Sequence, residues 1–244
     1  MLGPSGSAAI YVTRGTARNT LERAPIGSDP PGRMRAVKPE AFIELLGRVR
    51  ASAILRTSIE GAAGPAMDAA IRGGFRIVEF TLNTPGALDQ IGEFSRRDDV
   101  VVGAGTVHTV EDARDAVRAG ASFVVSPVVD PVVIEAAATL GVCAIPGCHS
   151  PTELFLAHRA GAQLQKLFPA PATGPEWVRT VRGPMPFLRI VPTSGVTGDN
   201  ARAWLDAGCF AVGFVAALFD AEDLRDRRFE RIAERARLLL AAIG

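Results

Sequence analysis

The sequence has few cysteines, almost no net charge and no long apolar run. Its three cysteines, Cys143, Cys148 and Cys209, are an odd number without CxxC spacing, which predicts reduced, mostly buried thiols in a cytosolic protein. The formal net charge of +1 gives no electrostatic basis for binding nucleic acid or an anionic membrane. No apolar stretch approaches the roughly 20 residues that span a bilayer, so we expect no membrane role.

Histidine is equally scarce, and its spacing does not indicate a metal site. The three histidines, His108, His149 and His158, lack the HxH or HxxxH spacing of zinc ligands. His149 and Glu153 lie four residues apart, which we interpret as a capping and surface arrangement. We therefore expect no metal.

Residues 1–33 differ in composition from the rest of the chain. They are rich in Gly, Pro, Ser and Arg and contain only two acidic residues. We expect a disordered tail, or an upstream start with translation beginning at Met34; an organelle-targeting peptide is the alternative. Residues 34–244 are expected to form a single domain, and the expected location is the cytoplasm.

A repeating strand–helix pattern begins near residue 51. Apolar, β-branched runs alternate with amphipathic segments of about ten to fifteen residues, several of which end in glycine. The strand-like runs are 51–56, 76–82, 100–106, 122–127, 142–147, 164–169, 187–193 and 211–215. Eight even units predict an α/β fold, a closed (β/α)8 TIM barrel; the competing open doubly wound sheet is disfavoured because GxGxxG is missing after the first strand.

Helices are also expected outside and between these units. Residues 38–50 are predicted to form a helix that caps the barrel floor, and residues 222–243 a long closing helix. Thr109, Ser150 and Thr197 are predicted to begin helices through capping chemistry.

Polar residues gather at the carboxyl ends of the predicted strands, where the active sites of such barrels lie. These residues are Arg56, Glu79 with Thr81 and Asn83, Thr106, Ser126, the Pro146–Gly147 turn, Lys166, Thr193 and the Gly213 region.

Lysine is the scarcest charged residue. Only Lys38 and Lys166 are lysines among 27 basic residues, and Lys166 lies within an apolar run, LQKLFPA. Burial lowers the pKa of an ammonium group and so makes a neutral amine available to attack a carbonyl, which arginine cannot do. A structural ion pair with a barrel carboxylate is the alternative.

Glu79, in VEFTL, is the second buried charge. It either pairs with Lys166 or Arg56 or acts as a general acid and base, since burial raises a carboxylate's pKa toward neutrality. An amine, a guanidinium and a carboxylate around an apolar cavity suit a 2-oxo acid: the lysine takes the carbonyl, the arginine takes the carboxylate, and the glutamate moves protons.

Six motifs occur in order and resemble the signatures of one enzyme family. They are AILRT (53–57), VEFTLNTPGAL (78–88), VGAGTV (102–107), IPGCHSPTEL (145–154), LQKLFPA (164–170) and VPTSGV (191–196). Over about residues 51–219 the chain resembles the 2-dehydro-3-deoxy-phosphogluconate and phosphogalactonate aldolases. These are Schiff-base, pyruvate-releasing enzymes that include the 4-hydroxy-2-oxoglutarate aldolases.

The resemblance implies cleavage of a 2-keto-3-deoxy sugar acid, 6-phosphorylated or not, to pyruvate and an aldehyde such as glyceraldehyde 3-phosphate. It implies that Lys166 forms the Schiff base and that Glu79 moves protons, directly or through water. Arg56 and Thr106 would bind the pyruvoyl carboxylate or nearby polar groups, and the Pro146–Gly147 turn would close one wall. The family is typically a homotrimer that needs no metal or organic cofactor.

Two departures from the family pattern bear on the substrate. Many members have Arg in place of Asn83; a phosphogalactonate-type branch has Asn there and binds the anion with the first-strand arginine, here Arg56. Members also hold phosphate on a Gly-Gly turn and a Gly-Ser pair after strands seven and eight. This chain has Thr193-Ser194-Gly195-Val196 and Gly213-Phe214-Val215-Ala216 there, so a non-phosphorylated substrate such as 4-hydroxy-2-oxoglutarate is the alternative.

Other protein classes fit parts of the pattern. A phosphosugar isomerase or epimerase needs no imine-forming lysine, and a metal-dependent aldolase needs a ligand set. A non-catalytic barrel that binds a metabolite is suggested by the altered turn after strand eight. Lys166, Glu79, Arg56 and Thr106 together favour the aldolase.

Overall fold

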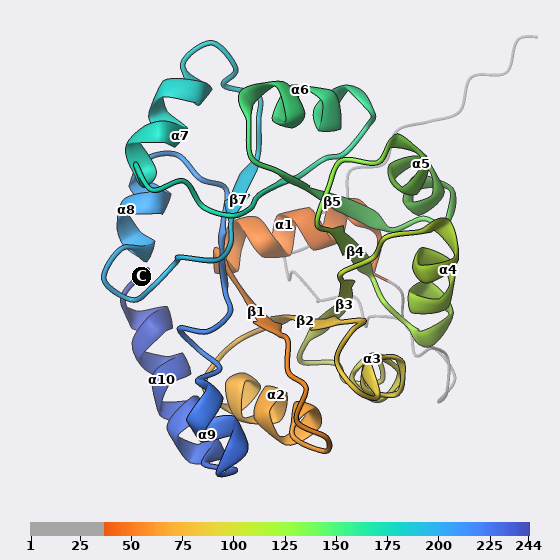
Figure 1. Ribbon diagram of the computed structural model, residues 1–244, viewed down its shortest axis with the longest axis vertical. Helices are drawn as coiled ribbons and strands as arrows, with labels where there is room; N and C mark the ends of the chain where they lie inside the picture. Colours follow the sequence, from red (N-terminus) through yellow and green to blue (C-terminus); the bar gives the residue numbers. More distant parts are fainter. Residues whose placement is uncertain (1–36) are drawn as a thin grey trace, which may run out of the picture. The chain divides into compact units, whose positions relative to one another are not determined.

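Eight parallel strands alternate with helices in the computed structural model, which describes residues 37–244 (Figure 1). The strands are β1 Ala51–Leu55, β2 Ile77–Thr81, β3 Val101–Gly105, β4 Phe123–Ser126, β5 Cys143–Cys148, β6 Gln165–Leu167, β7 Ile190–Pro192 and β8 Val212–Phe214. The helices are α1 Pro39–Val49, α2 Ala63–Arg72, α3 Ala87–Phe94, α4 Val110–Ala119, α5 Pro131–Thr139, α6 Pro151–Arg159, α7 Pro175–Arg182, α8 Ala201–Asp206, α9 Ala221–Arg225 and α10 Phe229–Ala241.

The strands follow one another around a barrel. Hydrogen bonding connects them in the order β7-β6-β5-β4-β3-β2-β1-β8, and a parallel bridge between Thr193 and Gly213 brings β7 against β8. The predicted (β/α)8 barrel is therefore confirmed, and the open doubly wound sheet is wrong.

Helix α1 closes the amino-terminal end of the barrel, as predicted for residues 38–50. Its Phe42 and Leu46 are buried against side chains that point into the barrel, among them Ile77 and Val191. The Phe42 ring stacks on Phe123 with ring centroids 4.5 Å apart. In Figure 1 the helix lies across the centre of the ring of strands. With this end filled, the opposite end is the one left open to substrates.

Capping side chains begin two of the helices, as the sequence predicted. Thr109 and Asp112 form a capping box at α4, and Ser150 and Glu153 form one at α6. Thr197, in contrast, does not begin a helix: α8 starts four residues later, and the Thr197 N–H donates to Asn200 Oδ1 at 2.8 Å within the preceding turn.

The single closing helix expected over 222–243 is wrong, because the chain breaks between α9 and α10. Arg227 adopts a left-handed conformation with φ of 53°. The turn brings two arginines of α10 onto Asp223, whose side chain is buried: Arg231 lies 3.1 Å and Arg235 2.5 Å from its carboxylate oxygens. A buried carboxylate needs such partners, and one straight helix would not supply both of these contacts.

Strand seven also begins later than predicted. Leu188 donates its N–H to the Met185 carbonyl at 3.2 Å, so a turn occupies the first residues of the predicted run and β7 starts at Ile190.

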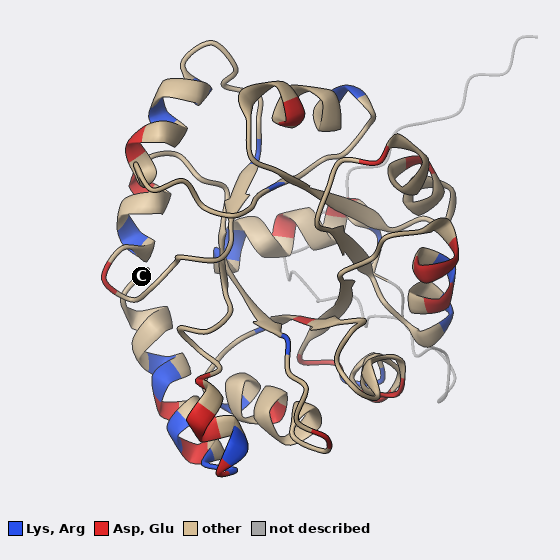
Figure 2. Ribbon diagram, viewed as in Figure 1, with Lys and Arg blue, Asp and Glu red and all other residues tan. Residues whose placement is uncertain are grey.

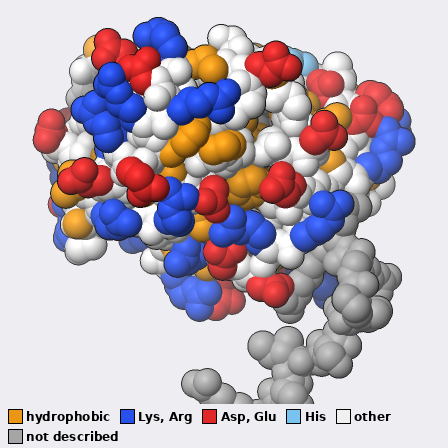
Figure 3. Space-filling view, turned by 90° about the horizontal axis from the view of Figure 1, so that it is seen from below, with side chains coloured by type: hydrophobic (Ala, Val, Ile, Leu, Met, Phe, Trp, Pro, Cys, Tyr) orange, Lys and Arg blue, Asp and Glu red, His pale blue; other side chains and the backbone are white. Residues whose placement is uncertain are grey.

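Charged residues lie mostly on the helices and loops, as Figure 2 shows. On the face drawn in Figure 3 basic and acidic side chains are interspersed, which agrees with the net charge of +1. Among residues 37–244 no helix is both long and apolar enough to cross a bilayer. The predictions for residues 1–33 lie outside the described residues.

Candidate active site

A cavity of about 560 Å³, here called the mouth, opens at the carboxyl ends of the strands. Residues that follow β1, β3, β6, β7 and β8 contribute to its lining. A second cavity of about 20 Å³, here called the inner cavity, lies within the barrel above the α1 side chains Phe42 and Leu46. Three residues line both cavities and so lie between the mouth and the barrel interior: Ile54, Lys166 and Thr193.

Lys166 is presented by the short strand β6. Its backbone pairs in register with Gly147 of β5 and Val191 of β7, and its neighbours Gln165 and Leu167 are buried. Its Nζ lies 5.0 Å from the centroid of the Phe168 ring, within cation–π range. Among residues 37–244 the Lys166 side chain has no hydrogen bond and no ion pair within 4.0 Å, although its charge still acts on the Glu79 carboxyl group. The Phe168 ring is therefore the contacting partner of this ammonium group among residues 37–244.

Glu79 lies in β2 with its side chain only 3% exposed and lines the inner cavity with Lys166. Desolvation raises the pKa of its carboxyl group, and the nearby Lys166 charge partly offsets that rise. The Oε1 atom is buried and has no hydrogen-bond partner. A carboxylic acid in this state can both give and take a proton.

Gly105 provides the space for this carboxylate. A Cβ atom at Gly105 would lie 1.9 Å from Glu79 Oε1, so any larger residue would collide with the acid. The first glycine of the GAG sequence, Gly103, instead provides space for the Phe123 ring, which a Cβ there would approach to 2.5 Å. Gly105 therefore leaves space for the Glu79 carboxylate, and Gly103 leaves space for the Phe123 ring.

Arg56 and Thr106 both line the mouth, as predicted. Arg56 follows β1, is exposed, and has no hydrogen bond or ion pair with other residues in 37–244. Thr106 follows β3 in a left-handed conformation with φ of 60°, which is strained for a residue with a side chain. A free guanidinium at this end of the barrel can bind an anion.

The predicted loop after β7 also lines the mouth. Thr193 is 3% exposed and its Oγ1 atom is buried without a partner. Ser194 and Gly195 follow with φ of 62° and 93°. The backbone N–H groups of Ser194, Gly195 and Val196 have no hydrogen-bond partner within the described part of the chain. They remain available to a ligand.

Four predicted site residues line neither the mouth nor the inner cavity. Asn83 is exposed on the loop between β2 and α3, and Pro146, Gly147 and Gly213 are buried within strands. The glycines have packing roles: a Cβ at Gly147 would lie 2.3 Å from the Pro127 carbonyl oxygen, and one at Gly213 would lie 2.6 Å from Thr193 Cγ2.

Several lining residues were not among the predicted site residues, among them His108, Phe168 and Thr81. His108 was considered only as a metal ligand, Phe168 only as part of a motif, and Thr81 only as a polar strand end. Thr81 Oγ1 donates to the Leu55 carbonyl at 3.3 Å and contacts Thr84 Oγ1 at 3.1 Å, so its hydroxyl is already engaged. The position of His108, two residues after Thr106, was the available signal for its place in the mouth.

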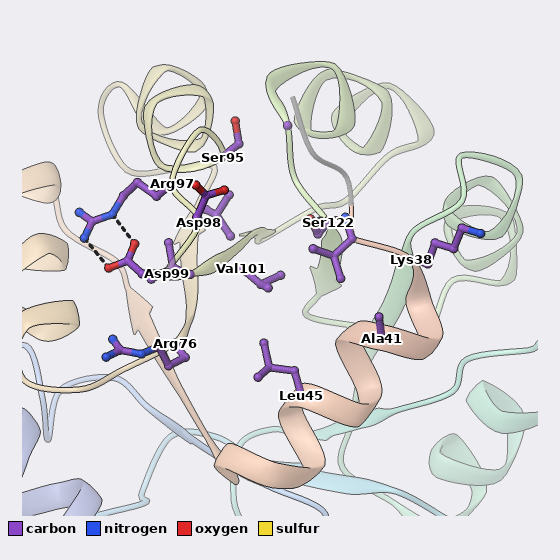
Figure 4. A pocket seen from close by; sticks show the side chains of 14 residues that line it. Lys38, Ala41, Leu45, Arg76, Ser95, Arg97, Asp98, Asp99, Val101 and Ser122 are labelled. Carbon is purple, nitrogen blue, oxygen red and sulfur yellow. Dashed lines mark hydrogen bonds and ion pairs between the residues drawn. The ribbon is translucent and has the colours of Figure 1, made fainter. Parts of the chain in front are cut away.

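A third cavity, of about 430 Å³, lies at the amino-terminal ends of the strands beside α1 (Figure 4). Its charged groups are already engaged: Arg97 is 2.9 Å from Asp99 and 2.8 Å from Asp68, and Arg76 donates to backbone carbonyls. Figure 4 shows the Lys38 amine pointing away from this hollow. Lys166 and Glu79, whose Oε1 atom has no partner, instead both line the inner cavity.

Comparison with known proteins identifies the family of the chain. Residues 43–235 match the family described as "Aldolase: KDPG and KHG aldolase". The chain is 34% identical over 184 residues to 2-dehydro-3-deoxy-6-phosphogalactonate aldolase of Escherichia coli, covering 74% of this chain and 90% of the relative. It is 38% identical over 161 residues to 2-dehydro-3-deoxy-phosphogluconate aldolase of Treponema pallidum, covering 65% and 77%.

Two solved structures are similar over most of the barrel. The native KDPGal structure has a TM-score of 0.72 at 33% identity and covers 79% of this chain and 93% of its own. KDPG aldolase from Legionella pneumophila, with pyruvate captured as a covalent carbinolamine intermediate, has a TM-score of 0.71 at 27% identity and covers 79% and 97%. The chain belongs to the KDPG and KHG aldolase family.

Proposed function

We propose that this chain is a class I aldolase that cleaves a 2-keto-3-deoxy sugar acid to pyruvate and an aldehyde, with Lys166 as the Schiff-base lysine. The observation that carries the proposal is that Lys166 and Glu79 line the same inner cavity. An unpaired amine lies beside a buried carboxyl group whose Oε1 atom has no partner. The carbinolamine of the Legionella relative is the first intermediate that such an amine would form.

In the proposed reaction Lys166 Nζ attacks the C2 carbonyl, and loss of water gives an iminium ion. The iminium nitrogen accepts the electron pair of the C3–C4 bond while the C4 hydroxyl group loses its proton, and the aldehyde leaves. The resulting enamine takes a proton at C3, and hydrolysis by water returns pyruvate and the free lysine.

Glu79 is the proposed carrier of these protons. Its raised pKa keeps a proton available at higher pH than an exposed carboxyl group would. The inner cavity of about 20 Å³, which it shares with Lys166, has room for one water molecule that could carry a proton between them.

Arg56 and Thr106 are the proposed ligands of the pyruvoyl carboxylate, since they present a free guanidinium and a hydroxyl group at the mouth. Asn83 is not expected to contact this carboxylate, because it lies outside the mouth lining.

A 6-phosphorylated substrate is the finer proposal. The free N–H groups of residues 194–196 support it, because backbone N–H groups in left-handed loops commonly bind phosphate. Val215 and Ala216, which line the mouth beside them without a polar side chain, favour a non-phosphorylated substrate such as 4-hydroxy-2-oxoglutarate. Pyruvate release from both kinds of substrate, measured side by side, decides between them.

Borohydride reduction in the presence of pyruvate tests the mechanism. We expect a covalent adduct on the peptide that contains Lys166. Lys166→Arg should abolish both the adduct and turnover while the far-ultraviolet circular dichroism spectrum is unchanged. The chain's other lysine provides the control: Lys38 is exposed and outside the mouth, so Lys38→Arg should retain both. Pyruvate release by Lys166→Arg would show that the mechanism is wrong.

We also propose a homotrimer, as the family resemblance implies. Light scattering during size exclusion should then give about three times the 25.7 kDa chain mass.

A further inference from the structure

The side chains of residues 37–244 that line the mouth are basic or neutral. Arg56, His108 and Lys166 contribute to this lining, whereas Glu79 lies in the inner cavity and Asp112, whose carboxylate interacts electrostatically with His108, is not part of it. A carboxylate that enters the mouth therefore meets no acidic side chain in the described lining. Of the three basic groups only His108 has no role in the proposed function.

The backbone holds His108 at the mouth from both sides. Thr106 turns the chain through its left-handed conformation, and Val107 is fully buried and donates its N–H to the Val125 carbonyl at 3.1 Å. The N–H of His108 itself donates to Asp112 Oδ2 at 2.9 Å. The ring is exposed, lines the mouth, and has no hydrogen bond within residues 37–244.

Side-chain oxygens already accept the backbone donors of three residues near the ring. The Asp112 carboxylate accepts the N–H groups of both His108 and Thr109, and Thr109 Oγ1 accepts the N–H group of Asp112. A neutral imidazole still has one N–H to donate, and a protonated one has two.

His108 and Arg56 approach the same side of the mouth. Strands β1 and β3 both pair with β2, Leu55 with Phe80 and Phe80 with Ala104, so the residues that follow β1 and β3 flank the end of β2. The wall formed by Val196 and residues 215–217 has no charged side chain. The Arg56 guanidinium and the His108 ring are therefore on the side formed by β1 and β3, and Lys166 enters from β6.

We propose that His108 is a substrate-binding residue that donates a hydrogen bond to the C1 carboxylate of the 2-oxo acid, beside Arg56. The inference rests on the proposed Schiff-base aldolase function. The carboxylate is present in the substrate, in the iminium ion and in pyruvate, so this contact stabilises all of them about equally. Its loss should raise KM and leave kcat nearly unchanged.

Pyruvate is the probe that isolates this contact, because it has the C1 carboxylate and no distal group. We would measure the pyruvate concentration that gives half-maximal borohydride trapping in the parent, His108→Ala and His108→Gln. Loss of a charge-assisted hydrogen bond predicts a rise of about tenfold in His108→Ala. Gln retains an N–H donor, so His108→Gln should recover part of the difference. His158→Ala, outside the mouth, is the matched control and should equal the parent.

Each alternative result identifies a different error. If the pyruvate concentration for half-maximal trapping is unchanged in His108→Ala while KM for a phosphorylated substrate rises, the ring contacts the distal phosphate group. The proposal is then wrong. If neither value changes, His108 does not contact substrate. Failure of the parent to form any adduct would instead remove the aldolase proposal itself.

Discussion

Substitution of Gly105 by alanine should separate the role of Glu79 from the stability of the barrel. The new Cβ would lie 1.9 Å from Glu79 Oε1, whereas ordinary contacts begin at 3.4 Å. The carboxylate must therefore move by about 1.5 Å, the difference between these two distances. A displacement of roughly 1 Å at a reacting group can lower the rate by about 10²-fold, so we expect kcat for pyruvate release to fall by at least that factor.

The stability of the variant should fall much less than its activity. Overpacking by one methyl group typically costs about 1–3 kcal/mol, and each kcal/mol lowers Tm by roughly 2–4 °C in a chain of this size. The protein should remain folded at assay temperature. Borohydride trapping of pyruvate should still modify Lys166, but more slowly, because proton transfer during imine formation has lost its carrier.

Gly103→Ala is the matched control. It adds the same methyl group two residues earlier in β3, where the Cβ would lie 2.5 Å from the Phe123 ring and not against Glu79. We expect a comparable loss of Tm and a kcat within about threefold of the parent. Equal losses of kcat in both variants would mean that barrel distortion causes the effect. Full activity in Gly105→Ala would show that the position of Glu79 does not limit the rate.

Three further outcomes follow from burial and hydrogen bonding. Desolvation raises the pKa of Glu79, so the free energy of unfolding should fall as pH rises from the usual value of 4.5 through the raised value. Denaturation across pH should show no such fall in Glu79→Gln, which has no titrating group at this position. Pyruvate release by the same variant should have a kcat lowered by about 10²–10⁴-fold. The backbone N–H groups of the capping box lower the pKa of Glu153, so its contribution to the free energy of unfolding is present above pH 4.5 and is lost as pH falls through the lowered value. Glu153→Gln should therefore flatten the acid side of the Tm–pH curve. An unchanged slope would contradict this. Gly92→Ala in α3 should raise stability by about 0.5–1 kcal/mol, because its Cβ would make an ordinary 3.5 Å contact. Gly73→Ala should lower stability, because its Cβ would lie 2.3 Å from Ala236 Cβ. Thermal melts that give the opposite order of stability would refute the packing argument.

The sequence predicted the barrel well because local patterns specify its parts. Strands buried on both faces require continuous apolar runs; seven of the eight predicted runs contain a whole strand of the structure, and β5 extends one residue beyond the predicted run 142–147. The capping boxes at Thr109 and Ser150 involve residues three positions apart, so they too could be predicted. The break between α9 and α10 could not, because it depends on how Asp223 is buried against two arginines that follow it by eight and twelve residues.

The residues of the candidate site likewise fall into those that the sequence predicted and those that only the structure revealed. Lysine scarcity singled out Lys166, and a charge inside an apolar strand singled out Glu79; both signals are local, and the structure places both residues on the inner cavity. Only the tertiary structure decided which other side chains meet them. Asn83 and Gly213 follow or lie in barrel strands yet stay outside the mouth, whereas His108 enters it.

The physical reason is that strand composition reports burial but not the direction of a loop side chain. That direction depends on contacts between segments far apart in the sequence: Val107 on β4, Gly105 against Glu79, and Gly213 against Thr193. The chain alone therefore determined the barrel and singled out Lys166 and Glu79, the two residues proposed to react. The closing of the strands into a ring determined the space around those groups and the residues that share it.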